Sequence, residues 1–325
     1  MTQAIRIHQT GGPEVLTWET VELGTPGPGE ARIKQSAVGL NYIDVYHRTG
    51  LYPVPALPTA IGMEAAGQVE SVGEGVNDLR PGDRVAYAAP PVGAYAEARL
   101  MPADRLVKLP DGISDVQAAA MMLQGMTVQY LIRRTFRVSK GDTVLFHAAA
   151  GGVGLIACQW LKHLGATVIG TVGSDEKAEL ARAHGCDHPV NYRTGNFVDR
   201  VREITDGAGV PVVYDSVGKD TFEGSLDCLA PLGMFVGFGN ASGPVPPFNM
   251  GVLAQKGSLF VTRPTLMTYT AKRADLLASA NELFDVVLSD AVKIEINQTY
   301  PLAETAQAHR DLEARKTTGS TVLLP

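Results

Sequence analysis

The chain has 325 residues, of which 45% are hydrophobic, and a formal net charge of −6 at pH 7. A chain of this length is too long to fold around one ordinary hydrophobic core, which predicts two domains. The acidic balance, without a basic tract, argues against duplex nucleic acid or an anionic membrane as the main partner. The first residues, MTQAIRIHQT, lack the charged and apolar regions of a signal peptide. The widely separated cysteines offer neither a disulfide framework nor a Cys-x-x-Cys metal pair, which favours reduced, buried thiols and a cytoplasmic location.

Residues 1 to about 110 have the pattern of a β-rich domain. Short alternating runs predict strands at 31–36, 66–72 and 83–86, separated by turns that contain glycine and proline. A nearly unbroken apolar stretch then predicts a helix over 114–134 with Ser114 as its N-cap.

The segment 142–171, DTVLFHAAAGGVGLIACQWLKHLGATVIGT, predicts a strand, a glycine-rich turn, a helix at 155–164 and a second strand. Backbone amides at such a helix N-terminus bind a pyrophosphate, because free N–H groups and the helix dipole favour anions. Ala149 stands where the strict G-x-G-x-x-G fingerprint has its first glycine, so a turn that binds no nucleotide remains the alternative. The run 144–161 approaches membrane-spanning length, but its glycines and His147 fit a turn better.

Strands and helices alternate after this segment, which predicts a parallel, doubly wound sheet. The expected strands are 167–171, 188–191, 210–215, 233–238 and 258–262. The expected helices are 175–184, 196–205 and 219–229. The tail adds helices near 271–289 and 303–315 and a strand at 320–324, which we expect to return to the first domain.

The run GSLFVT at 257–262 is expected to be the last strand of the central sheet. An edge strand with free N–H and C=O groups can pair with a copy of itself across a twofold axis. The sequence therefore predicts a homodimer through strand 258–262, with a helix or loop covering this edge as the alternative.

Several motifs occur in one order along the whole chain: GLNYID at 39–44, GQV at 67–69, PGDRV at 81–85, the turn 149–154, DSVG at 215–218 and EAR at 313–315. With these motifs the chain resembles the medium-chain dehydrogenase/reductase superfamily and, within it, the zinc-free quinone oxidoreductases related to zeta-crystallin. The resemblance implies an α/β fold with a Rossmann doubly wound parallel sheet that binds NADPH at 126–264. It implies a GroES-like β-barrel catalytic domain at 1–125 and 265–325.

Zinc-containing members of the superfamily polarise their substrate with a bound ion. Compared with them, this chain has Asn41 in place of the first cysteine ligand and Met63 in place of the histidine of a Gly-His-Glu segment. One carboxylate, Glu64, beside a methionine makes a poor zinc site. We therefore expect no metal, and we expect Glu64 to be a buried carboxylate near the site.

The end of the second strand of the nucleotide-binding segment decides between NAD and NADP, because NAD enzymes typically place a carboxylate there. Here Gly173 leaves room for a 2′-phosphate, Ser174 can donate a hydrogen bond, and Lys177 adds a positive charge one turn later. Alternatively, Ser174 is only a helix N-cap and Lys177 a surface residue. An inward-turned Asp175 would favour NAD. The resemblance adds Arg315 as a second phosphate partner, so NADPH is the predicted cofactor.

The resemblance also implies which residues surround the nicotinamide and the substrate. Tyrosines can offer a ring face to a flat quinone and a hydroxyl to its oxygen, although Tyr42 and Tyr46, four apart, can equally line a helix face toward the core. The expected catalytic residues are Asn41, Asp44, Tyr46, Tyr52 and Arg263. The expected cofactor-binding residues, with Gln124 near them, are Asn41, Thr127, Ala150, Gly151, Gly152, Val153, Gly173, Ser174, Lys177, Tyr192, Val217, Phe238, Asn240 and Arg315.

Hydride transfer to a quinone depends chiefly on positioning, because the developing phenolate is already a stable anion. Hydrogen bonds from Asn41, Tyr46 or Arg263 can stabilise it further, and the proton can come from solvent or a tyrosine. The histidines show no ligand spacing, and a structural hydrogen bond explains His147. The leading prediction is NADPH-dependent reduction of a quinone. Reduction of an enone or alkenal C=C bond is one alternative, and a non-enzymatic nucleotide- or RNA-binding role, which the acidic charge disfavours, is another.

Overall fold

The computed structural model describes residues 1–54 and 56–325, and the chain divides into two compact units. Unit 1 contains Met1–Met126, Thr270–Leu288 and Ile294–Pro325. Unit 2 contains Thr127–Tyr269 and Ser289–Lys293. The junction expected at 264/265 lies after Tyr269 instead. The ring of Tyr269 stacks on Tyr130 at 4.5 Å between centroids, and its carbonyl accepts a hydrogen bond from Arg134, so this segment packs within unit 2.

Unit 2 is built on a sheet with the strand order β11-β10-β9-β12-β13-β14, in which every described pairing is parallel. Its strands are β9 (Thr143–Phe146), β10 (Thr167–Val172), β11 (His188–Asn191), β12 (Val210–Asp215), β13 (Leu229–Gly237) and β14 (Phe260–Thr262). The strands are short apolar runs, as expected for a sheet covered on both faces. The strand order reverses between β9 and β12, which is the arrangement of a Rossmann fold.

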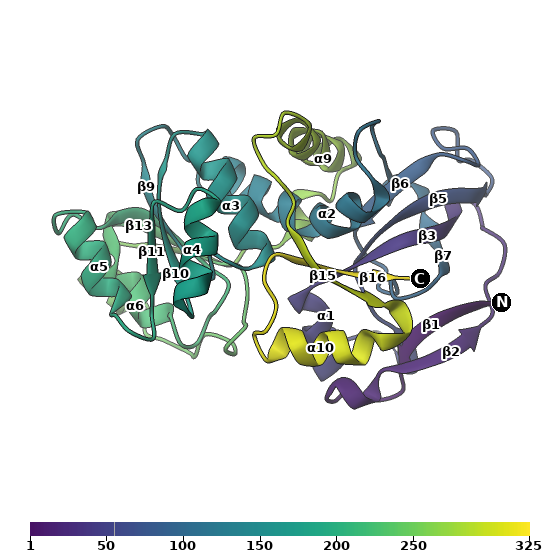
Figure 1. The fold of residues 1–325 in the computed structure, drawn as a ribbon, viewed down its shortest axis with the longest axis horizontal. Coiled ribbons are helices and arrows are strands. Elements are labelled where there is room, and N and C mark those ends of the chain that lie inside the picture. Colours follow the sequence, from purple (N-terminus) through teal and green to yellow (C-terminus); the bar gives the residue numbers. More distant parts are fainter. Residues whose placement is uncertain (55) are drawn as a thin grey trace. The chain divides into compact units, whose positions relative to one another are not determined.

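Helices cover both faces of this sheet. Figure 1 shows α3 and α4 on one side of the strands and α5 and α6 on the other. The helices of unit 2 are α3 (Gly152–His163), α4 (Asp175–Ala183), α5 (Phe197–Ile204), α6 (Phe222–Asp227), α7 (Gly251–Gln255) and α8 (Leu266–Tyr269). Apolar side chains from strands and helices, among them Leu145, Val213 and Phe222, form its core.

Several predicted boundaries in unit 2 are wrong for local reasons. Helix α3 begins at Gly152 rather than at 155, so the glycines form its first turn. Helix α6 is shorter than the predicted 219–229, because its last predicted residue, Leu229, already pairs with Val210 as part of β13. Strand β14 is shorter than 258–262, since Ser258 has a left-handed φ of 58° that a strand does not allow. The short helices α7 and α8 were not predicted.

Unit 1 contains the sheet β2-β1-β4 and a larger sheet, β15-β16-β3-β5-β6-β8, with β7 also paired to β3. Its strands are β1 (Thr2–Ile7), β2 (Thr17–Val21), β3 (Glu30–Leu40), β4 (Thr59–Ala60), β5 (Glu64–Val72), β6 (Arg84–Ala88), β7 (Ala98–Pro102), β8 (Val107–Lys108), β15 (Ile296–Pro301) and β16 (Ser320–Leu324). Strand β16 pairs antiparallel with β3. The tail of the chain therefore returns to the first domain, as predicted.

The first residues of β3 alternate in burial, with Ala31, Ile33 and Gln35 buried between more exposed neighbours, and residues 37–40 are all buried. This period of two places one face of the strand on the core of unit 1. The predicted strands at 31–36 and 66–72 lie within β3 and β5, and the third overlaps β6.

The helices of unit 1 are α1 (Tyr42–Thr49), the first turns of α2 (Asp115–Tyr130), α9 (Arg273–Leu288) and α10 (Thr305–Glu313), with shorter turns η1 (Pro13–Val15), η2 (Ala103–Arg105) and η4 (Leu302–Glu304). The Ser114 hydroxyl accepts a hydrogen bond from the N–H of Gln117 at 3.2 Å, which confirms the predicted N-cap of α2. The predicted helix over 114–134 ends as α-helix at Tyr130 and continues as a π-helix over Leu131–Thr135. Within the described ranges, no helix has the length and apolar character needed to cross a bilayer.

Candidate functional site

The carboxyl ends of β9 and β12 flank the point where the strand order of unit 2 reverses. In doubly wound sheets, ligands bind outside the strand ends at this point. Many of the predicted cofactor residues lie on the segments that follow the carboxyl ends of β9, β10, β12 and β13: Ala150, Gly151, Gly152, Val153, Gly173, Ser174, Val217, Phe238 and Asn240.

The glycine turn connects the end of β9 directly to the N-terminus of α3. Ala148 has a φ of 56°, and the N–H of Ala149 donates to the carbonyl of Thr171 at 3.0 Å, which ties the turn to β10. Gly151 is the N-cap of α3 and brings no side chain that could satisfy the first N–H groups of the helix. These groups and the helix dipole form a site suited to an anion.

Gly154 allows α3 to pack closely on the strand that precedes it. A Cβ at this position would overlap the carbonyl oxygen of Ala148 and lie 2.6 Å from the carbonyl carbon of Ala149. Close helix–strand packing is the physical role of the third glycine in the dinucleotide fingerprint. The turn therefore meets this requirement although Ala149 replaces the first glycine.

At the end of β10, the hydroxyl of Ser174 accepts a hydrogen bond from the N–H of Lys177 at 3.3 Å and caps α4. The carboxylate of Asp175 accepts from the side-chain amide of Asn191 at 2.8 Å. The hydroxyl of Tyr192 lies 2.7 Å from where a Cβ on Gly173 would be. Gly173 therefore makes room for Tyr192, and the structure brings these two predicted residues together.

A buried aspartate organises the turn after β12, and the sequence analysis used it only as part of a motif. Asp215 Oδ1 accepts from the N–H groups of Val217 at 2.7 Å and Gly218 at 3.0 Å. Its Oδ2 accepts from the hydroxyls of Thr221 at 2.6 Å and Ser225 at 3.2 Å. An aspartate at the end of an apolar strand with glycine three residues later is the sequence signal for such a turn.

His147 is confirmed as a structural histidine. Its ring nitrogens lie 2.9 Å from the hydroxyl of Thr171 and 2.9 Å from that of Ser225, and its ring packs edge-on against Phe197. Burial lowers the pKa of His147, so its imidazole is neutral at pH 7. Through these contacts His147, which follows β9, connects this strand to β10 and α6.

The loops after β12 and β13 are held together by backbone hydrogen bonds, including the one from the N–H of Ser242 to the carbonyl of Val217 at 2.8 Å. Phe238 begins the second loop, and its ring centroid lies 5.8 Å from that of Phe146 in β9. Asn240 follows in the same loop. The structure therefore brings Val217, Phe238 and Asn240 to one edge of the sheet. Two other predicted residues of unit 2 lie elsewhere along the chain: Thr127 in α2 and Arg263 after β14.

The predicted substrate residues of unit 1 surround helix α1. Asn41 precedes the helix, Asp44 and Tyr46 lie on it, and Tyr52 follows it. The ring of Tyr46 lies 5.0 Å from that of Tyr52 and 6.0 Å from that of Tyr42. Tyr46 is buried, while Tyr42 and Tyr52 are half-buried. The aromatic rings therefore form one group with partly accessible edges.

The side chain of Asn41 is held from two directions. Its Nδ2 donates to Glu64 Oε2 at 2.6 Å, and its Oδ1 accepts from Gln124 Nε2 at 3.1 Å. Gln124 Oε1 lies 2.9 Å from the hydroxyl of Ser320 on β16. When Glu64 is ionised, its carboxylate only accepts hydrogen bonds and so determines which face of the Asn41 amide carries the NH₂ group.

A second chain of hydrogen bonds leads from the start of α1 to α10. Asp44 Oδ2 accepts from the N–H of Asn41 at 3.0 Å and from the hydroxyl of Tyr95 at 2.8 Å. The Tyr95 hydroxyl lies 3.0 Å from His309 Nε2, and Arg48 Nη1 lies 2.9 Å from His309 Nδ1. Arginine has only donors and keeps its proton, so His309 Nδ1 accepts and Nε2 carries the ring hydrogen. This chain orients Asp44 but cannot pass a proton beyond Arg48.

The outer end of this chain is an ion pair. Arg48 donates two hydrogen bonds to the carboxylate of Glu313, at 2.8 and 2.9 Å. Burial and the neighbouring charge of Arg48 lower the pKa of His309 to about 3, so the ring is neutral. The Arg48–His309 contact is therefore a hydrogen bond between a cation and a neutral ring.

The two carboxylates beside Asn41 are both fully buried, with exposed fractions of 0%. Burial raises the pKa of Asp44 to about 7, although the hydrogen bonds from Asn41 and Tyr95 lower it. Burial likewise raises the pKa of Glu64 to about 8, against the hydrogen bonds from Leu123 and Asn41. In the described part of the chain, Asp44 Oδ1 has no hydrogen-bond partner. Asp44, predicted to be catalytic, contacts Asn41 and Tyr95 in this structure and has no exposed surface.

This donor set does not fit a zinc ion. The Asn41 amide is engaged by Glu64 and Gln124, and both oxygens of Glu64 accept from N–H groups, the second from Leu123 at 2.7 Å. Met63 could supply only a thioether, a poor ligand for zinc. Among residues 1–54 and 56–325, no group of three or more His, Cys, Asp or Glu side chains could hold a metal. No chemical step is therefore assigned to a metal here.

Arg315 follows α10 in unit 1 and has a left-handed φ of 59°. Burial raises the pKa of Tyr42, and the charge of Arg315 opposes this shift, so the guanidinium lies near the start of α1. The other predicted phosphate contacts, Ser174 and Lys177, belong to unit 2. The predicted cofactor residues are thus divided between the two units.

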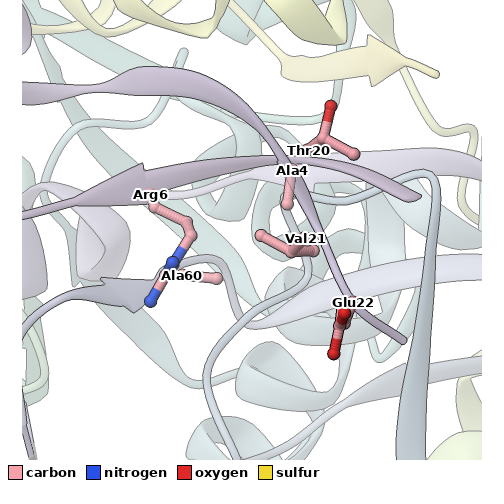
Figure 2. A pocket seen from close by; sticks show the side chains of 6 residues that line it. All are labelled: Ala4, Arg6, Thr20, Val21, Glu22 and Ala60. Carbon is pink, nitrogen blue, oxygen red and sulfur yellow. The ribbon is translucent and has the colours of Figure 1, made fainter. Parts of the chain in front are cut away.

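Figure 2 shows a hollow of about 450 Å³ elsewhere in unit 1, on the sheet β2-β1-β4. Its lining residues are Ala4, Arg6, Thr20, Val21, Glu22 and Ala60. Arg6 already donates to the carbonyl of Pro58 at 2.9 Å and lies 3.6 Å from Glu19. The lining includes no predicted site residue, so this hollow is not the candidate site.

Two family models match separate stretches of the chain. The family model of the alcohol dehydrogenase GroES-like domain matches residues 27–111, and that of the zinc-binding dehydrogenase matches residues 152–278. The chain is 56% identical to a quinone oxidoreductase of Pseudomonas aeruginosa, with 100% of both proteins covered. It is 49% identical to a 2-haloacrylate reductase of a Burkholderia species, with 100% of this chain and 99% of that protein covered. The crystal structure of an Escherichia coli quinone oxidoreductase complexed with NADPH matches with a TM-score of 0.98 and 49% identity, covering 99% of this chain and 100% of that one.

Proposed function

The chain belongs to the quinone oxidoreductase family of the medium-chain dehydrogenase/reductase superfamily, and we propose that it transfers a hydride from NADPH to a quinone without a metal. The observation that carries this proposal is the uncapped N-terminus of α3 at the point where the strand order reverses, in a chain 56% identical to a quinone oxidoreductase. NADPH supplies the hydride from its nicotinamide ring.

In this proposal the residues of the chain bind NADPH and orient it. The first N–H groups of α3, from Gly152 and Val153, hold the pyrophosphate. Ser174, Lys177 and Arg315 bind the 2′-phosphate through charge-assisted hydrogen bonds. The remaining proposed cofactor residues are Asn41, Thr127, Ala150, Gly151, Gly173, Tyr192, Val217, Phe238 and Asn240.

The proposed substrate residues stabilise the phenolate that develops as the quinone accepts the hydride. Tyr46 and Tyr52 offer ring faces and hydroxyls to the quinone, and Asn41 and Arg263 are further donors. Asp44 acts through the N–H of Asn41 that it holds, because its side chain is fully buried.

The test is the rate of NADPH oxidation with 1,4-benzoquinone and 9,10-phenanthrenequinone as acceptors. We expect turnover with both quinones, a lower KM for NADPH than for NADH, and unchanged rates after treatment with a chelator. Inhibition by the chelator would contradict metal independence. A chain that oxidises no NADPH with any acceptor would point instead to the non-enzymatic nucleotide- or RNA-binding role.

A second candidate function is the reduction of an electron-poor C=C bond. It is favoured by the relative named 2-haloacrylate reductase, which is 49% identical over its whole length. Rates with 2-chloroacrylate and 2-alkenals, measured beside the quinones, separate the two activities. Higher kcat/KM for the alkenes than for the quinones would make this the principal function.

The same proposal includes a homodimer in the cytoplasm. Strand β14 lies at the edge of the sheet, and its Phe260 and Val261 are 56% and 37% exposed. Two copies of β14 can pair across a twofold axis. Phe260→Pro removes a ladder donor and should yield monomer or insoluble protein. A monomeric wild type in sedimentation at micromolar concentration would refute the dimer.

The free, buried cysteines Cys158, Cys186 and Cys228 suit a reducing compartment, which supports the proposed cytoplasmic location.

A further inference from the structure

Glu64 at the start of β5 is a carboxylate with no exposed surface, and both of its oxygens accept hydrogen bonds. Oε1 accepts from the backbone N–H of Leu123 in α2 at 2.7 Å. Oε2 accepts from Asn41 Nδ2 at 2.6 Å. A buried carboxylate is costly, so its presence among apolar strands requires compensation by these two donors.

The fold leaves a tightly fitted space for this carboxylate. A Cβ on Gly39, the residue of β3 that pairs with Glu64, would overlap both Glu64 Oε2 and the carbonyl oxygen of Ala119 in α2. The side chain of Glu64 is therefore enclosed by β3 and α2. The absence of a side chain at Gly39 makes room for this carboxylate between β3 and α2.

The Asn41 amide has two orientations of equal shape, which exchange its oxygen and its NH₂ group. With an ionised carboxylate on one side, the NH₂ group must face Glu64, and Oδ1 then faces Gln124. One N–H of Asn41 Nδ2 donates to Glu64. Because Glu64 fixes the position of the NH₂ group, it also fixes the direction of the second N–H.

We propose that Glu64 is the positioning residue of the hydride-transfer site, and that its carboxylate selects the orientation of the Asn41 amide that faces the nicotinamide and the acceptor. This inference rests on the proposed function, since it assumes that Asn41 contacts these groups.

The hydrogen bonds around Asn41 can all reverse together, and this makes the inference testable. In Glu64→Gln the single amide oxygen of the new glutamine still accepts the hydrogen bond from the backbone N–H of Leu123. The new NH₂ group therefore faces Asn41. Asn41 then turns its oxygen toward residue 64 and its NH₂ group toward Gln124. Gln124 turns in the same way and donates to the hydroxyl of Ser320, whose one hydrogen, shared in the wild type between Gln124 Oε1 and the carbonyl of Ala120, then goes to Ala120 alone, 2.8 Å away. Every group remains hydrogen-bonded, but the Asn41 amide is inverted.

The decisive experiment compares activity with stability in Glu64→Gln. The assay is run above pH 8, because burial raises the pKa of Glu64 to about 8 and the carboxylate is ionised only above that value. We expect Tm there to stay close to that of the wild type, while kcat/KM for 1,4-benzoquinone falls about tenfold to a hundredfold because a donor of the site is misdirected. Glu97→Gln is the matched control: Glu97 also accepts a backbone N–H in unit 1, from Gln3 at 3.0 Å, and its substitution should leave kcat/KM unchanged. Unchanged activity in Glu64→Gln, or parallel losses of activity and Tm, would overturn the positioning role.

A readout without turnover separates this inference from the proposed function. The side-chain ¹⁵N–¹H signals of Asn41, identified by their loss in Asn41→Asp, should shift strongly in Glu64→Gln because the carboxylate acceptor is replaced. Signals that do not shift would overturn the inference even in an active enzyme. A wild type that reduces neither quinones nor alkenes would refute the proposed function, whereas the amide signals would still report whether Glu64 orients Asn41.

Discussion

The N-termini of helices α3 and α1 show two opposite uses of the same electrostatic feature. Helix α3 begins at a glycine N-cap without a side-chain cap, so its first N–H groups and its dipole are available to an anion. Helix α1 begins at Tyr42 after the N-cap Asn41, and the carboxylate of Asp44 in its first turn accepts the N–H of Asn41. One helix end is left open to an anion, and the other is occupied by a carboxylate of the chain itself.

The two helix N-termini depend on the fold in different ways. The α3 terminus works through the backbone, so its requirement is the absence of side chains at a few consecutive positions. The α1 terminus works through the N-cap Asn41 and side chains from β5, α2 and β16 that meet only in the folded unit. Substitutions at the two ends should therefore fail in different ways.

The largest effect is expected at the α3 terminus. In Gly154→Ala the new Cβ overlaps the backbone of Ala148, so the turn must open and the N–H groups lose their alignment. NADPH affinity should fall at least about a hundredfold, measured by fluorescence titration with circular dichroism to confirm folding. Gly195→Ala is the control, since its nearest contact is at 3.7 Å. Equal affinities in the two variants would show that the bare helix end is not the phosphate site.

An intermediate effect is expected at the α1 terminus, in the dependence of stability on pH. Burial raises the folded pKa of Asp44 from 3.8 to about 7, so between these values the folded state holds a proton that the unfolded state has lost. The free energy of unfolding should therefore fall as pH rises from about 4 to about 7. The full loss from this group is on the order of 4 kcal/mol.

Asp44→Asn removes this titration while keeping an oxygen for Asn41 and Tyr95. Urea unfolding at several pH values should show a flatter profile than in the wild type, with the remaining slope due in part to Glu64, whose pKa is also raised by burial. Asp220→Asn, at an exposed position, serves as the control. A wild-type profile that rises between pH 4 and 7, or one that Asp44→Asn leaves unchanged, would contradict the role of buried charge at this helix end.

The smallest effect is expected beside α3, at the start of α4. Lys177→Ala should raise the KM for NADPH about tenfold to a hundredfold and leave that for NADH nearly unchanged, since a charge-assisted contact to a phosphate contributes about 1.5 to 3 kcal/mol. Lys293→Ala, an exposed lysine of the same unit, is the control. Equal effects on both cofactors would remove Lys177 from the 2′-phosphate site.

The sequence predicted the elements of unit 2 well because each is a local pattern. The strands at 188–191 and 210–215 have the predicted bounds, since short apolar runs between turns carry their own signal. Prediction failed where neighbours decided the outcome. Leu229 belongs to β13 because Val210 pairs with it. Helix α3 begins at Gly152 rather than at the predicted residue 155, because the turn before it is hydrogen-bonded to Thr171 of β10.

The candidate site divides in the same way. The glycine turn could be found from the sequence, because its requirement is small residues at adjacent positions. The contacts of Glu64 and Asp215 could not, since a buried carboxylate is recognised only by its donors, such as Leu123, Asn41 and Thr221. A sequence shows that a carboxylate is present but not which N–H groups surround it.

From the sequence alone, local spacing determined the alternating strands and helices and the glycine turn, and the family resemblance of the motifs determined the Rossmann and GroES-like units and the positions, Asn41 and Met63, where zinc-containing members have ligands. Only the tertiary structure decided which of two orientations the Asn41 amide takes, which nitrogen of His309 carries the hydrogen, and why Asp44 is fully buried. The physical reason is that orientation and protonation depend on donors and acceptors brought together from β5, α2, α10 and α1, which lie far apart along the chain.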